Sequence, residues 1–180
     1  MAFSVNLLTQ QAYQIPDSLD DSEAIEEFLS RNKEKKVVVV QGLGFVGAVM
    51  SIVCANALTE EYAVIGVDLA NENTYWKIKS INDGIFPLIS EDPKIAEFFE
   101  RSREQGNLLA TYDPVAYKYA DVVIVDINLD VKKISEECGV LKEFDVDLSG
   151  FKAAIRSVGA HCRDNVLVLV ETTVPPGTCE

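Results

Sequence analysis

The chain has 180 residues, of which 48% are hydrophobic and 25% charged, the composition of one folded globular domain. Its formal net charge of -13 at pH 7 disfavours nucleic-acid partners and anionic membrane surfaces, because the summed field repels phosphate. Residues 43–58, the longest weakly polar stretch, are shorter than the roughly 20 residues that cross a bilayer. Residues 1–14 lack the pattern of an export signal. We therefore expect a cytoplasmic protein without a membrane span.

The first 35 residues are predicted to form a helical extension. Asp20 or Asp21 can cap a short helix, in which Ile25, Phe28 and Leu29 recur at helical spacing. We expect this helix to pack on the outside of the main domain, which the sequence places at residues 36–180.

From residue 37 onward, β-branched runs alternate with helical sequence. Residues 37–40 are all valine, which is typical of a central strand covered on both faces. Further strands are predicted at 63–68, 107–111, 120–127 and 165–170. Helices are predicted at 45–58, within 73–103, at 114–119 and at 148–162, and residues 128–145 are predicted to form a charged loop. This alternation predicts an α/β fold, a Rossmann-type doubly wound parallel sheet with helices on both faces.

A glycine-rich motif separates the first strand of this series from the helix that follows it. Gly42 permits a tight turn, Gly44 lets the backbone approach a pyrophosphate, and Gly47 lets the helix pack closely on the sheet. The helix N-terminus offers free N–H groups to an anion, so no basic side chain is needed. The motif and its setting predict a dinucleotide site.

Asp68 ends the second predicted strand, 68 − 42 = 26 residues after the first glycine. A carboxylate near this distance binds the adenosine ribose, and it favours NAD over NADP because a 2′-phosphate would meet a negative charge. An alternative is that Asp68 only caps the next turn. A second alternative is an S-adenosylmethionine-dependent methyltransferase, although that fold usually has an acid before its first glycine, where this chain has Gln41.

The cysteines and the single histidine limit the chemistry further. Cys54, Cys138, Cys162 and Cys179 show no C-x-x-C pair or other metal-ligand spacing, which indicates four reduced thiols. His161 alone cannot supply a histidine pair. We expect no metal site.

Four motifs in order resemble the UDP-glucose/GDP-mannose dehydrogenase family, across most of residues 36–180. They are Gly42-Leu-Gly-Phe-Val-Gly47; Lys77 with Ile81-Asn-Asp-Gly84 and Pro87-Leu88; Gly106-Asn-Leu-Leu-Ala-Thr111 with Tyr119-Ala-Asp-Val-Val-Ile124; and Thr172-Thr-Val-Pro-Pro-Gly-Thr178. Enzymes of this family oxidise the C6 alcohol of a nucleotide sugar to a carboxylate with NAD. The resemblance therefore implies an NAD-dependent oxidoreductase of polysaccharide biosynthesis, with a nucleotide-sugar substrate and a possible homo-oligomeric state.

The resemblance also implies roles for individual residues. The cofactor-binding residues would be Gly42, Gly44, Phe45, Val46, Gly47, Asp68, Lys77, Ile127, Asn128 and Thr172. Lys77 would reach toward the adenosine end, although a solvated surface lysine is the alternative. Thr173 would be the catalytic hydroxyl near the reacting sugar and the nicotinamide, although a threonine closing a strand before a proline-rich turn is the alternative.

The chain departs from the family pattern after its strand at 120–127. The family has V-N-T-P there, whereas this chain has Ile127-Asn-Leu-Asp130, and Asp126 stands in an otherwise apolar strand end. Asp126 is expected either at the open cofactor cleft or paired with a lysine. The family's nucleophilic cysteine would lie beyond the segment that residues 172–180 resemble. We expect the chain to bind NAD without oxidising sugar alone, and an NAD-binding module that has lost catalysis is the alternative.

Overall fold

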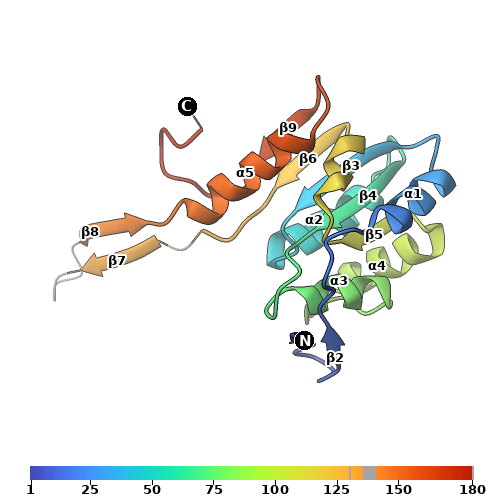
Figure 1. The fold of residues 1–180 in the computed structure, drawn as a ribbon, viewed down its shortest axis with the longest axis horizontal. Helices are drawn as coiled ribbons and strands as arrows, with labels where there is room; N and C mark the ends of the chain where they lie inside the picture. The colour runs from blue at the N-terminus through green and yellow to red at the C-terminus, as the bar shows by residue number, and fades with distance from the viewer. Residues whose placement is uncertain (130, 136–140, 180) are drawn as a thin grey trace.

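Five parallel strands form the central sheet of the computed structural model, which describes residues 1–129, 131–135 and 141–179 (Figure 1). They are β3 (Lys36–Gln41), β4 (Tyr62–Val67), β5 (Leu108–Thr111), β6 (Val122–Val125) and β9 (Leu167–Val170). Their order across the sheet is β5-β4-β3-β6-β9, and every neighbouring pair is parallel. The predicted doubly wound sheet is confirmed, with β3 at the centre where the strand order reverses.

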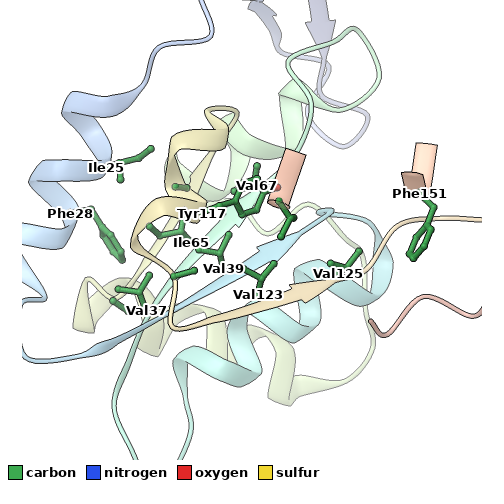
Figure 2. Close-up of a cluster of buried hydrophobic side chains, with 14 residues drawn as sticks. Ile25, Phe28, Val37, Val39, Ile65, Val67, Tyr117, Val123, Val125 and Phe151 are labelled. Carbon is green, nitrogen blue, oxygen red and sulfur yellow. The ribbon is translucent and has the colours of Figure 1, made fainter. Parts of the chain in front are cut away.

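The valine run of β3 supplies both faces of the sheet because successive side chains of a strand point to opposite sides. Val37 and Val39 belong to one buried cluster, and Val38 and Val40 to another. The first cluster also contains buried side chains of α1 (Ser22–Arg31), η1 (Pro114–Tyr119) and α5 (Ser149–His161), among them Ile25, Phe28, Tyr117 and Phe151 (Figure 2). Helix α2 (Phe45–Ala55) contributes to the second cluster, so the sheet is buried on both sides.

Two predicted helical stretches differ in detail from the observed ones. Residues 73–103 contain two helices, α3 (Tyr75–Asn82) and α4 (Pro93–Gln105), and Asp92 caps α4 by accepting a hydrogen bond from the Lys94 N–H at 2.9 Å. The helix at 114–119 is a 3₁₀ helix. Pro93 marks the start of α4 because proline at the first turn removes only an N–H that would lack a helical partner.

The first 35 residues contain more than the expected helix. A two-stranded antiparallel hairpin, β1 (Phe3–Val5) and β2 (Ala12–Gln14), precedes α1 and packs on α3. The Ser4 hydroxyl donates to the Glu72 carbonyl and accepts from the Trp76 N–H. Helix α1 lies in the outer layer, but its Ile25 and Phe28 are buried within the main core.

The prediction of a loop at 128–145 was wrong for residues 131–135 and 141–145, whereas residues 128 and 129 lie outside any helix or strand. Strands β7 (Val131–Ser135) and β8 (Leu141–Val146) pair as an antiparallel hairpin that projects away from the central sheet (Figure 1). A ribbon of this kind is defined by the backbone pairing of its two strands. Its charged sequence therefore does not show the alternation of apolar and polar residues that predicts a half-buried strand.

Candidate functional site

The glycine loop joins β3 to α2 in a turn that other residues would obstruct. Gly42 has a φ of +98°, which side-chain-bearing residues rarely adopt, and its N–H donates to the Val67 carbonyl at 2.8 Å. A Cβ on Gly47 would lie 1.9 Å from the Gly42 carbonyl oxygen. The first turn of α2 therefore rests directly on the loop.

Gly44 stands at the N-cap of α2 and faces open space. Apart from Gly44 itself, its two chain neighbours and the nearby backbone of the helix, no described heavy atom lies within 4 Å of the position that a Cβ on Gly44 would occupy. Protein packing does not demand glycine there, which is the expected condition if a ligand must approach the backbone. Phe45 and Val46 follow in the first helical turn with exposed fractions of 69% and 49%.

A cleft of about 480 Å³ opens at the carboxyl ends of β3, β4, β5 and β6. Its walls are formed at or after the ends of four strands, by one residue before α1 and by one face of α5. The lining residues are Leu19, Gln41, Gly42, Gly44, Val67, Asp68, Leu69, Thr74, Lys77, Tyr112, Pro114, Tyr117, Asp126, Ile127, Asn128, Gly150, Ala153, Ala154 and Ser157. Ligands of open α/β sheets bind at this edge, next to the switch in strand order. The structure thus gathers six of the expected site residues at one cleft: Gly42, Gly44, Asp68, Lys77, Ile127 and Asn128.

Asp68 is 9% exposed and uses both carboxylate oxygens. Oδ2 accepts a hydrogen bond from the Leu43 N–H at 3.0 Å, and Oδ1 accepts one from the Leu69 N–H at 2.8 Å. Burial raises the pKa of Asp68, while these two bonds and then the charge of Lys77 oppose the rise. Asp68 does tie the turn after β4. Each oxygen nevertheless keeps a second lone pair, so the carboxylate remains able to accept from a ribose hydroxyl.

The two threonines of the C-terminal motif lie in different environments. Thr172 is buried, and its hydroxyl oxygen accepts a hydrogen bond from the Ile127 N–H at 2.8 Å. Thr172 therefore holds the loop after β6 in place, and it is not among the residues that line the cleft. Thr173 is exposed and stands outside the cleft walls that the described residues form. Both follow the carboxyl end of β9.

Asp126 lies at the cleft, one of the two positions that its sequence left open. Its Oδ2 is buried without a hydrogen-bond partner among the described residues, and it would stand 3.3 Å from a Cβ on Gly47. Burial, and then the charge of Glu171, raise the pKa of Asp126. A carboxylate oxygen that no described residue compensates with a donor thus stands beside the glycine loop. Asp130, the other departure in this segment, lies outside the described residues.

Several residues of the cleft were not expected from the sequence. Tyr112 and Pro114 follow β5, so the general rule for carboxyl strand ends could have found them. Tyr117 is 1% exposed, and its hydroxyl has no hydrogen-bond partner in the described part of the chain. Burial raises the pKa of this phenol. No local signal marks Leu19, which lies before α1.

Neither a cluster of metal ligands nor a disulfide is present among the residues that the structure describes. Within those residues, no three His, Cys, Asp or Glu side chains are grouped to hold a metal ion. Cys54, Cys162 and Cys179 are free thiols, and Cys138 lies outside the described residues. The same residues include no helix that is both long and apolar enough to cross a bilayer.

The fold and the cleft together define a dinucleotide-binding Rossmann domain. A parallel sheet with its central strand feeding a glycine turn, and a buried acid after the next strand, is the arrangement that holds NAD. Residues 35–180 match the NAD binding domain of the UDP-glucose/GDP-mannose dehydrogenase family, and the chain belongs to this family. The resemblance seen in the sequence is confirmed, and the methyltransferase alternative is not supported.

Relatives carry the names of nucleotide-sugar dehydrogenases. The chain is 31% identical over 143 residues to UDP-N-acetyl-D-mannosamine dehydrogenase of Pyrococcus horikoshii, and 27% identical over 145 residues to UDP-glucose 6-dehydrogenase TuaD of Bacillus subtilis. These matches cover 79% and 80% of this chain, and 30% and 27% of the relatives. The chain thus spans about 30% of the length of the curated relatives it matches.

Solved structures agree with these relatives. NDP-N-acetyl-D-galactosaminuronic acid dehydrogenase from Methanosarcina mazei Go1 superposes with a TM-score of 0.66 and 27% identity, over 86% of this chain and 31% of that one. A ternary complex of GDP-mannose dehydrogenase from Pseudomonas aeruginosa gives a TM-score of 0.59 and 29% identity, over 78% and 29%. NAD is the cofactor of this domain, and the open approach to Gly44 fits it.

Proposed function

We propose that this domain supplies the NAD site of a nucleotide-sugar 6-dehydrogenase, which oxidises the C6 alcohol of the sugar to a carboxylate. The observation that carries this proposal is the single cleft that joins the glycine loop to Asp68 in a chain of this family. The reaction needs two oxidation steps, and in each of them one hydride from C6 would pass to a molecule of NAD at this site, while water would supply the second carboxylate oxygen. The relatives that act on nucleotide sugars support the substrate class.

We propose roles in NAD binding for individual residues of the chain. Gly42, Gly44, Gly47 and the first turn of α2, with Phe45 and Val46, would hold the pyrophosphate through backbone N–H groups. Asp68 would accept from the adenosine ribose, and Lys77 would contribute positive charge at the same end. Ile127 and Asn128 would contact the cofactor across the cleft from α5, held in place by Thr172.

Thr173 is proposed as the hydroxyl near the nicotinamide and the sugar. Its exposure after the carboxyl end of β9 supports this role, because an exposed hydroxyl there is available to a ligand or to another part of a larger protein. We further propose residues 1–35 as an extension to the NAD-binding domain at 36–180, a cytoplasmic location and a homo-oligomer. Nucleic acid is not proposed as a partner, since the chain carries a net charge of -13.

Calorimetric titration of the 180-residue chain tests the proposal directly. We expect saturable binding of NAD, weaker binding of NADP and none of S-adenosylmethionine. Asp68→Asn should weaken NAD binding by about tenfold or more, because a hydrogen bond to a charged group is lost, and it should narrow the preference over NADP.

Asp92→Asn is the matched control for that variant. Asp92 also accepts from a backbone N–H, but at the start of α4 and outside the cleft. Equal NAD affinity in the Asp68 and Asp92 variants would remove Asp68 from the site. A wild-type chain that binds S-adenosylmethionine and not NAD would overturn the proposed function.

A further inference from the structure

Leu19 lines the cofactor cleft although it lies outside the residues that match the family. It belongs to the segment between β2 and α1, whereas the match begins at residue 35. Leu19 is 60% exposed, and Leu69, which lines the same cleft, is 63% exposed. Two large apolar side chains are therefore presented to solvent from different parts of the chain at one cleft.

Hydrogen bonds fix the backbone beside Leu19 against the carboxyl end of β5. The Asp21 N–H donates to Asp113 Oδ2 at 2.9 Å, and the Thr111 hydroxyl donates to Asp21 Oδ2 at 2.5 Å. The Tyr112 hydroxyl donates to the Asp20 carbonyl at 3.5 Å. The segment is therefore held in place before any ligand binds, and little ordering of the backbone is needed to use it.

The strand order indicates which part of NAD would reach Leu19. Along the edge of the sheet, the glycine loop follows β3, Asp68 follows β4, and Tyr112 follows β5. A dinucleotide with its pyrophosphate at the loop and its ribose at Asp68 must place the next group, the adenine ring, toward β5. That is the end of the cleft where Leu19 is anchored.

Resting on the proposed function, we propose that Leu19 packs against the adenine ring of bound NAD. The segment before α1 thereby completes the cofactor site of a domain whose family match does not include it. A flat aromatic ring covers exposed apolar surface at both Leu19 and Leu69 without requiring a charged partner, which suits an acidic chain.

Titration of NAD and of ADP-ribose into the wild-type chain and Leu19→Ala tests this contact. We expect Leu19→Ala to weaken both ligands by the same factor, about three- to tenfold, because both contain adenine and only NAD contains nicotinamide. Leu19→Met should restore most of the affinity. Leu58→Ala is the matched control, since Leu58 is 95% exposed and does not line the cleft. Chemical unfolding should give similar stability for all four proteins.

Three outcomes separate the alternatives. Wild-type affinity in Leu19→Ala would overturn the contact and leave the NAD site intact. A loss for NAD with none for ADP-ribose would also overturn it, because Leu19 would then serve the nicotinamide end. A wild-type chain that binds neither ligand would refute the proposed function itself, and the role of Leu19 with it.

Discussion

Asp126 lies where its charge would oppose the anionic ligand that the neighbouring glycine loop is proposed to bind. The pyrophosphate of NAD is anionic, and the glycine loop that would hold it rests against the backbone of Asp126. The carboxylate beside it has an oxygen without a partner in the described part of the chain. Burial and Glu171 raise its pKa, so this group retains its proton to higher pH than an ordinary aspartate.

The raised pKa of Asp126 determines how the stability of the chain changes with pH. Because the folded chain holds the Asp126 proton more tightly than the unfolded chain, its contribution to the free energy of unfolding falls as pH rises above the ordinary Asp range. The affinity for NAD should also fall as pH rises, since only the ionised form of Asp126 repels the anionic pyrophosphate. We expect NAD affinity to rise as pH falls toward the range where Asp126 is protonated.

Asp126→Asn should remove much of this dependence. We expect the variant to bind NAD about three- to tenfold more tightly at neutral pH, and its free energy of unfolding to be higher there. Calorimetry and urea unfolding across a pH series measure both quantities. Asp164→Asn, at an exposed loop position, makes the same change in net charge and should leave the pH profile unaltered. A parallel profile in the Asp126 variant would assign the dependence to another group.

Some residues of the cleft could be predicted from a local sequence motif, and others could not. The positions of Gly42 and Gly47 in the turn and of Asp68 at the cleft could be predicted, because a turn of this kind and an acid after the next strand follow a fixed spacing. Leu19 could not, because the neighbouring Asp20 and Asp21 hold its segment at the cleft through hydrogen bonds to residues 90 or more positions away. Tyr117 could not be predicted either, since an aromatic residue in a short helix is usually interpreted as part of the hydrophobic core.

At the scale of elements, prediction was best where burial determines the pattern. The valine run of β3 and the apolar start of α2 have few alternatives in a globular protein, and both were placed within a few residues. The two hairpins were missed for the opposite reason. The first has strands of three residues, and Ser4 and the adjoining Asn6 bond to residues in α3 and just before it, at separations of 68 to 74 residues.

Helix α1 offers a test of how far the N-terminal segment is part of the fold. Ile25 is fully buried in the cluster that includes Val39 and Val123. Ile25→Ala should lower the free energy of unfolding by about 2–5 kcal/mol, because truncation leaves a cavity in a packed core. Urea unfolding measures the loss. Leu7→Ala, at a side chain that is 70% exposed, should change stability by less than about 0.5 kcal/mol. Similar small effects in both would make α1 a loosely attached appendage.

At the scale of the whole molecule, the chain binds an anionic cofactor while carrying a net charge of -13. The proposed pyrophosphate contacts are backbone N–H groups at the helix N-terminus, whose partial charges act only at short range. The repulsion from the rest of the surface acts over longer distances and is therefore the part that salt screens.

This difference in range predicts that salt strengthens cofactor binding. Raising ionic strength from about 20 to about 200 mM should tighten NAD binding by about twofold, because screening weakens the repulsion more than the local contacts. ADP-ribose lacks the positive nicotinamide and should show a larger gain. Calorimetry at constant pH measures both affinities. A sucrose series at constant ionic strength and matched osmolality is the control for excluded-solute effects. Weaker binding at higher salt would mean that Lys77, or another cation near the cleft, contributes more than the backbone does.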